Sequence, residues 1–326
     1  MKKISVIIPN YNGYKYSDRC LKALENQTYK DFDVCIVDDC STDDSYLKLL
    51  EYADQSTLCI KIIKSDKNLG PGHSRKIGLE STNSEWVAFC DIDDWYDEDF
   101  LSTQLKNAEQ NSADLVLCDN TFVYEDGRRI KANITNWTKT RTVDKKSLLA
   151  LGKMSLCRLL CKRCLFEQIV IPDIYYGEDA PVTIQLIARS NKQYVDINAH
   201  YNYYVRSNSA SSNPRERAID DYQKAFDIIY NEINSDFPIE CEYIGINMIL
   251  YGKTLVMQKT NHNKKEIVTT IESFESIYPN WETNVYLSEL DIKKRIYLWA
   301  IKNKQLTFCH LFSNAHSYMI KKKNKQ

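Results

Sequence analysis

The sequence predicts an α/β protein with a mostly parallel sheet flanked by helices, followed by a helical C-terminal module. In the first half, short apolar segments alternate with amphipathic segments of helical length, a pattern typical of βαβ units. From about residue 215 the alternation stops and long amphipathic helical stretches dominate. The 326 residues are enough for two domains of ordinary size.

Each predicted element follows from local periodicity and from the residues at its ends. The expected strands cover residues 4–8, 32–37, 60–63, 86–90 and 115–118. The helices expected between them follow Ser17 and cover 41–52, 74–81 and 98–107, and a further helix is expected over 182–188. In the second half, helices are expected over 222–233, 244–258 and 264–277. A Ser- and Asn-rich stretch separates the halves, so we expect domains at 1–212 and 213–326.

Charge and composition exclude several classes of protein. The 43 basic and 44 acidic residues give a net charge of -1, which argues against nucleic acid as a partner. The N-terminus lacks a signal peptide and no apolar run is long enough to span a bilayer, so we expect a cytoplasmic protein with reduced cysteines. Residues 293–326 hold nine Lys or Arg and no Asp or Glu, interleaved with aromatic residues. This pattern fits peripheral contact with the inner face of the cell membrane, or a helix packed on the rest of the protein.

Polar residues follow each of the first four predicted strands, where ligands bind in parallel sheets. They are Pro9, Asn10 and Tyr11; then Asp38 and Asp39; then residues 68–75; and then Asp91, Asp93 and Asp94. Three neighbouring carboxylates repel one another unless a cation neutralises them, and Mg²⁺ or Mn²⁺ takes one or two such ligands. A solvated turn before a helix is the alternative interpretation of these acids.

Two further groups have residue types suited to catalysis. Arg75, at the start of a helix after a glycine turn, is a candidate to clamp a diphosphate. Glu178 and Asp179 precede a predicted helix and supply a carboxylate base separate from the acids at 91–94, although acids also favour a helix N-terminus. The motifs GxGxxG and GxxxxGK[ST] are absent, which argues against dinucleotide-binding proteins and P-loop NTPases.

Taken together, these motifs resemble the family 2 glycosyltransferases, enzymes of GT-A fold that build bacterial surface polysaccharides. The resemblance covers 1–212 and rests on SVIIPNYNG from Ser5, QTYKDFDVCIVDDCSTD from Gln27, NLGPGHSRKIGL from Asn68, DIDD from Asp91, GED from Gly177 and YNYYVRSNSAS from Tyr201. It implies an inverting, metal-dependent hexosyltransferase that uses a nucleoside diphosphate sugar, with UDP-hexose or UDP-N-acetylhexosamine as the expected donor. The implied acceptor is a hydroxyl of a glycan or a lipid-linked oligosaccharide.

The resemblance also assigns roles to residues. Pro9, Tyr11 and Asp39 would line the base, Asp38 would support that loop, and Asn68, Arg75 and Ile92 would complete the donor site. Asp91 would contact the ribose or the metal shell and Asp93 would bind Mn²⁺ or Mg²⁺, with Asp94 beside it; whether Asp93 or Asp94 dominates stays open. Asp179 would be the general base, with Glu178 orienting the acceptor.

Three alternative interpretations fit these motifs less well. A haloacid-dehalogenase-type phosphatase also has a DxD after a strand, but near its N-terminus, and a non-catalytic nucleotide-sugar-binding protein is expected to lose Asp93 or Asp179. The spacing of Cys157, Cys161 and Cys164 fits an iron–sulfur site. We interpret that stretch instead as a core-facing helix whose thiols act as small hydrophobic groups.

Overall fold

The computed structural model describes the chain except for residues 1, 133–137, 153, 207–215, 261 and 324–326. It divides into two compact units, Met1–Val205 and Arg206–Gln326. The expected boundary between residues 212 and 213 lies outside the described residues. All eleven cysteines are described, and each carries a free thiol.

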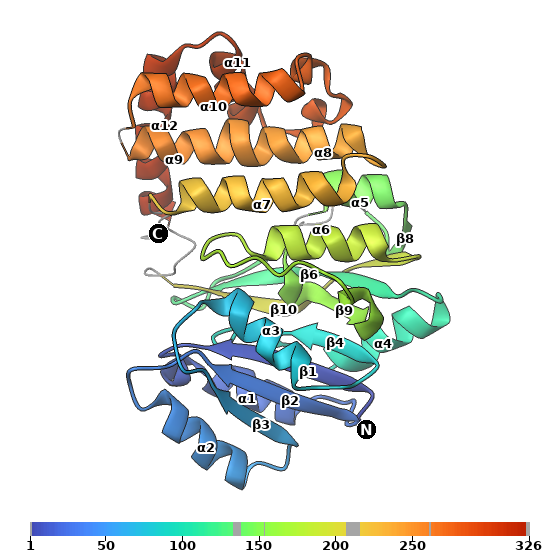
Figure 1. Cartoon of the computed structure of the whole chain (residues 1–326). Coiled ribbons are helices and arrows are strands. Elements are labelled where there is room, and N and C mark those ends of the chain that lie inside the picture. The colour runs from blue at the N-terminus through green and yellow to red at the C-terminus, as the bar shows by residue number, and fades with distance from the viewer. Residues whose placement is uncertain (1, 133–137, 153, 207–215, 261, 324–326) are drawn as a thin grey trace. The chain divides into compact units, whose positions relative to one another are not determined.

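The first unit is built on a mixed sheet that has ten strands within the described residues (Figure 1). Four parallel strands form one side, in the order β3 (Ile60–Lys64), β2 (Phe32–Asp38), β1 (Ile4–Asn10) and β4 (Trp86–Phe89). Because the strand order reverses between β1 and β4, the carboxyl ends of these two strands form the topological switch point at which α/β sheets bind ligands.

The other side of the sheet contains the antiparallel pairs. β9 (Leu159–Lys162) runs antiparallel between β4 and β6 (Leu115–Tyr124), and β10 (Gln193–Val205) runs parallel to β6. Three short strands pair antiparallel: β5 (Trp95–Tyr96) and β8 (Arg141–Val143) with β10, and β7 (Arg129–Ala132) with β6. The parallel character that the sequence predicted therefore holds for β3-β2-β1-β4 and for β6 with β10.

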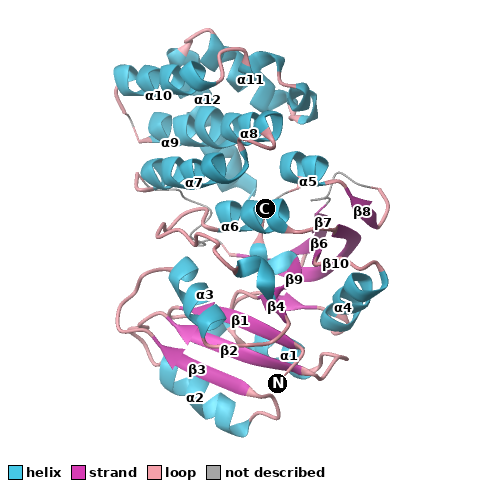
Figure 2. Cartoon of the chain, turned by 45° about the vertical axis from the view of Figure 1, so that its right-hand side comes forward, coloured by secondary structure: helices cyan, strands magenta, loops and turns pink. Residues whose placement is uncertain are grey.

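Helices cover both faces of the sheet, with α2 and α3 on opposite sides (Figure 2). They are α1 (Asp18–Glu25), α2 (Ser45–Gln55), α3 (Pro71–Glu80), α4 (Phe100–Gln110), α5 (Lys145–Leu151) and α6 (Asp179–Arg189). α3 packs closely on β1 because residue 78 is glycine: a Cβ there would lie 2.3 Å from Cγ2 of Ile7. This contact places the N-terminus of α3 beside the carboxyl end of β1.

Two local expectations are wrong. The helix expected from residue 41 begins only at Ser45, because the backbone N–H and hydroxyl of Ser41 donate to Asp38 and form a turn instead. The helix expected around Cys157 is a 3₁₀ turn, the central strand β9 and a second 3₁₀ turn. A strand buried on both faces has no hydrophobic alternation, so its sequence does not separate it from a buried helix.

The second unit is helical within the described residues. Its helices are α7 (Ala218–Ile233), α8 (Pro238–Gly245), α9 (Thr254–Lys259), α10 (Lys264–Ile277), α11 (Ile292–Lys302) and α12 (Leu306–Lys323), and a π-helical segment, Ile246–Lys253, joins α8 to α9. Phe226 and Phe274 pack around Gly245, where a Cβ would lie 2.6 Å from either ring. No helix in the described parts of the chain has the length and apolar character needed to cross a membrane.

Candidate active site

Two loops at the carboxyl ends of β1 and β2 are joined by hydrogen bonds to one buried carboxylate. Asp38 accepts from Nδ2 of Asn10 at 2.7 Å and from the N–H and hydroxyl of Ser41 at 2.9 and 2.6 Å. Asp38 is fully buried, so its carboxylate acts within the protein and fixes the shape of this edge. The sequence singled out Asp38 and Asn10, and it marked Ser41 only as the start of an expected helix.

The adjacent carboxylate, Asp39, joins the second loop to the third. Its oxygens accept from the backbone N–H groups of Leu69 and Gly70 at 3.1 and 2.7 Å, and its side chain is almost fully buried. Gly70 has a φ of 93°, a conformation that costs other residues free energy, and Pro71 then begins α3. The pairing of Asp39 with this turn fixes where α3 starts, and so where Arg75 lies.

The remaining residues expected to bind a donor lie around this edge with different exposures. Pro9 is buried in β1, whereas Asn68 is exposed and Tyr11 is 45% exposed. Ile92 is buried against the first loop: a Cβ at Gly13 would lie 2.6 Å from Cγ2 of Ile92. Gly13, which sequence reasoning missed, therefore allows the loop after β1 to approach the loop after β4.

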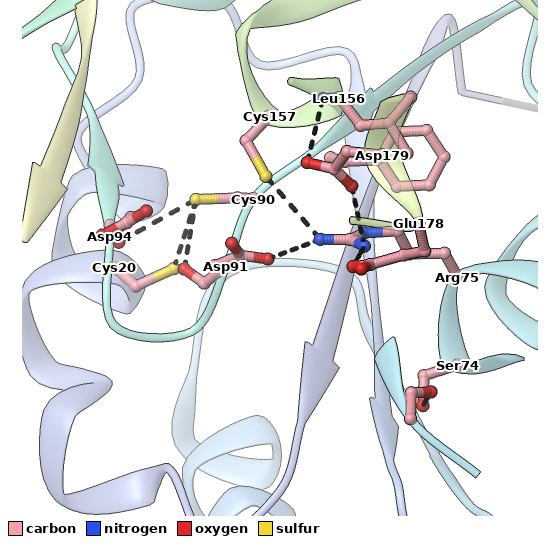
Figure 3. A network of polar contacts seen from close by, with 12 residues as sticks. Cys20, Ser74, Arg75, Cys90, Asp91, Asp94, Leu156, Cys157, Glu178 and Asp179 are labelled. Atoms are coloured by element: carbon pink, nitrogen blue, oxygen red, sulfur yellow. Dashed lines mark hydrogen bonds and ion pairs between the residues drawn. The ribbon is translucent and has the colours of Figure 1, made fainter. Parts of the chain in front are cut away.

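The buried guanidinium of Arg75 connects the two acidic groups of the site (Figure 3). Nη2 lies 2.9 Å from Oδ1 of Asp91, and Nη1 lies 2.7 Å from Oε1 of Glu178 and 3.0 Å from Oδ1 of Asp179. Nη2 also lies 4.0 Å from the thiol of Cys157. The structure thus brings Asp91, Glu178 and Asp179 together around a residue that the sequence assigned to a diphosphate.

Burial and charge set the protonation of the two carboxylates at the start of α6. Burial, together with the charge of Asp179, raises the pKa of Glu178 to about 7, although Arg75 opposes the shift. Burial also raises the pKa of Asp179, while Arg75 and the N–H of Leu156, 3.4 Å away, act to lower it. Glu178 therefore exchanges its proton close to neutral pH, the range in which general acid–base groups are effective, and Asp179 is shifted in the same direction.

The three aspartates after β4 lie in different surroundings. Asp94 is buried, and its oxygens accept from the hydroxyl of Tyr201 and from the N–H of Tyr204, the latter at 2.7 Å. Asp91 and Asp93 are partly exposed. Asp94 therefore ties the acidic loop to β10, and Asp91 and Asp93 are the members that solvent reaches.

The acidic loop fits a divalent cation that is held mostly by substrate. Within the described residues, no three His, Cys, Asp or Glu side chains are grouped to hold a metal ion on their own. Mg²⁺ and Mn²⁺ bind hard oxygen atoms and need only one or two protein carboxylates when phosphates complete the shell. Asp91 and Asp93 supply such oxygens at the switch point of the sheet.

Comparisons with known proteins agree with this geometry. The model of the family described as glycosyl transferase family 2 matches residues 5–165. Glycosyltransferase GlyA of Streptococcus pneumoniae is 26% identical over 223 residues, which cover 64% of this chain and 31% of GlyA. The poly(ribitol-phosphate) beta-N-acetylglucosaminyltransferase TarS of Staphylococcus aureus is 32% identical over 119 residues, which cover 36% of this chain and 21% of TarS. This chain thus matches less than a third of the length of either relative.

Two solved structures show the fold. Residues 1–349 of S. aureus TarS in complex with UDP-GlcNAc match with a TM-score of 0.76 and 21% identity, covering 97% of this chain and 91% of that chain. The mannosyltransferase PcManGT of Pyrobaculum calidifontis, in complex with GDP-Man and Mn²⁺, matches with a TM-score of 0.58 and 15% identity, covering 94% and 87%.

The sheet and its acidic switch point thus define a protein of GT-A fold. Residues 5–165, which the family model matches, belong to glycosyltransferase family 2. Family membership confirms the resemblance and sets aside the phosphatase alternative.

Proposed function

We propose that this protein transfers a sugar from a nucleoside diphosphate sugar to a hydroxyl group, with inversion, during synthesis of a bacterial surface polysaccharide. The observation that carries the proposal is the Arg75 bridge. It holds a carboxylate of the donor end, Asp91, and a carboxylate base, Asp179, at 2.9 and 3.0 Å from one guanidinium. Transfer needs these two functions close together but on different groups.

The donor would lie along the carboxyl ends of β1, β2 and β4. Tyr11 and Pro9 would line the base beside Asp39. Asp38 would hold the loop after β1 in place through its hydrogen bond from Asn10. Asn68 and Ile92 would border the same nucleotide, and Asp91 would contact its ribose. A UDP-linked hexose or N-acetylhexosamine is the proposed donor, because TarS, whose fold this chain shares, was crystallised with UDP and with UDP-GlcNAc.

Asp93, assisted by Asp91, would hold Mn²⁺ or Mg²⁺. A divalent cation in this position offsets the negative charge that develops on the departing diphosphate. Asp94 is placed differently, because both of its oxygens already accept hydrogen bonds from β10. We therefore assign Asp93 as the principal ligand and Asp94 as a residue that positions the loop.

Asp179 would remove the proton from the acceptor hydroxyl as the oxygen attacks the anomeric carbon. Arg75 aids this step by favouring the charged form of Asp179 and by fixing its orientation. Glu178, with a pKa of about 7, lies on the same guanidinium and would orient the acceptor. A single displacement from an α-linked donor gives a β-linkage.

The proposed acceptor is a glycan or a lipid-linked oligosaccharide at the cytoplasmic face of the cell membrane. Hydroxyl-rich acceptors of this kind fit the base at Asp179. They also fit the name of TarS, which describes transfer to poly(ribitol-phosphate).

The test is nucleotide release from UDP-, GDP-, CDP- and dTDP-sugars with Mn²⁺ or Mg²⁺, compared with EDTA and with Asp93→Ala. The proposal predicts metal-dependent release from one nucleotide class and its loss in the variant. Donor binding is followed in parallel by thermal shift. Absence of both release and binding for every donor would contradict the proposal.

A further inference from the structure

One face of α11 exposes large apolar side chains at helical spacing. Ile292, Ile296 and Trp299 are 64%, 42% and 62% exposed, and their separations of four and three residues place them on a single stripe. At the start of α12, Phe308 and Leu311 are 41% and 63% exposed and are likewise one turn apart. We call these five residues the α11–α12 stripe.

This stripe is not needed to hold the two helices in place. α11 packs through its opposite face, where Tyr297 is buried, bonds to the hydroxyl of Thr254 at 2.9 Å and contacts the ring of Phe312. α12 packs through Leu306 and Cys309, which are also buried. Both helices therefore have a buried apolar face and a second apolar face that is largely exposed to solvent.

Most charged residues on and beside the stripe are basic; the acidic exception is Asp291, the N-cap of α11, which precedes Ile292. Lys293 and Arg295 are exposed on α11, and helical geometry places them on the two sides of the line from Ile292 to Trp299. No Asp or Glu occurs from residue 292 to residue 326. Lys302 and Lys304 have another role, because they pair with Glu282 at 2.9 Å and Glu272 at 2.7 Å and fix the end of α11 within the unit.

We propose that the α11–α12 stripe binds the surface of an anionic phospholipid bilayer. An apolar stripe between basic residues matches the two layers of such a surface, because acyl chains lie beneath negatively charged headgroups. The same charges disfavour a second copy of this face as the partner, since equivalent Lys293 and Arg295 side chains would then lie close to each other. In the anchored state, Trp299 would lie at the level of the headgroups, where tryptophan is enriched.

The test is co-sedimentation of the full chain with vesicles of phosphatidylcholine that do or do not contain phosphatidylglycerol. We expect binding to the anionic vesicles, with a blue shift of tryptophan fluorescence that is absent in Trp299→Ser. Replacing Lys293 and Arg295 by Gln should weaken binding about fivefold for each charge removed. The double variant Ile296→Ser/Trp299→Ser should weaken it at least about tenfold.

A matched control is Leu47→Ser on α2, because Leu47 is also 61% exposed but lies in the first unit. It should bind vesicles like the wild type. Thermal unfolding and donor hydrolysis without vesicles check that each variant is folded, so failure of membrane binding is separate from failure of the proposed transfer. Three outcomes would overturn the proposal: no binding to anionic vesicles, equal binding by the double variant, or a dimer in lipid-free solution that the double variant dissociates.

Discussion

Replacing Arg75 by Gln tests how the two acidic groups of the site depend on one another. The substitution keeps hydrogen-bonding capacity but removes the charge that lies 2.9, 2.7 and 3.0 Å from Asp91, Glu178 and Asp179. Three carboxylates then remain close together without their cation. We expect a less stable protein and a base that stays protonated to higher pH.

The size of both effects follows from these distances. At an effective dielectric constant of about 20, an ion pair at 3.0 Å is worth about 5 kcal/mol before desolvation is counted. Removing one partner of a buried pair costs about 3–5 kcal/mol, which corresponds to a fall in Tm on the order of 10 °C for this unit. A neighbouring cation lowers the pKa of an aspartate, so without Arg75 a smaller fraction of Asp179 is ionised. At a fixed acidic pH, kcat should therefore fall by about 10- to 1000-fold.

The assay is the pH dependence of kcat and KM for donor turnover. Arg75→Gln should move the acid limb of kcat to higher pH, whereas Arg75→Lys should move it less because the charge remains. The matched control is Arg163→Gln, because Arg163 is also partly buried but donates its hydrogen bonds to the carbonyls of Ser84 and Leu79 and to the hydroxyl of Thr82. The reasoning is refuted if Arg75→Gln raises KM for the donor equally at every pH and leaves the acid limb of kcat in place.

Three further predictions concern other buried polar groups. Asp94→Asn should lower the free energy of unfolding by about 1–3 kcal/mol, because it disturbs the hydrogen bonds from Tyr201 and Tyr204. It should leave the Mn²⁺ concentration for half-maximal activity unchanged, whereas Asp93→Asn should raise that concentration. The pKa of Glu178 is raised from 4.5 to about 7, so between these two pH values the folded state binds more protons than the unfolded state. As pH rises across this range, the free energy of unfolding of the wild type, measured in urea, should fall by about 3 kcal/mol relative to that of Glu178→Gln. Burial acts to lower the pKa of His200, but Asp196 and Asp99, at 3.3 and 3.1 Å, raise it overall. The stability that His200 contributes is therefore complete below pH 6.5 and is lost as pH rises through the folded-state pKa. His200→Gln should remove this pH dependence of stability in urea titrations.

The strands of the first unit follow from sequence because apolar runs and the polar residues after them report directly on buried parallel strands. β1, β2, β3 and β4 begin at the expected residues. β9 was not predicted, since a four-residue strand buried between two others has no periodicity of its own. β5 was also missed, because two residues give no pattern and their pairing with β10 depends on contacts about a hundred residues away.

For the candidate site, the sequence predicts which residues lie at this edge of the sheet but not their contacts with one another. Spacing places Asp91 and Asp93 after one strand, yet nothing local shows that Asp94 turns inward to Tyr201. The contact of Arg75 with Glu178 and Asp179 joins residues more than a hundred positions apart, and only the tertiary fold brings them together. The roles of these residues in donor and acceptor binding stay predictions until variants are assayed.

The measurement that tests the proposed chemistry most directly is the configuration of the glycoside formed from an α-linked donor, with methanol as a small acceptor and NMR as the readout. Single displacement with Asp179 as base predicts a methyl β-glycoside, and Asp179→Asn should abolish its formation while donor binding in the thermal-shift assay persists. A methyl α-glycoside, or undiminished β-glycoside from Asp179→Asn, would contradict the account.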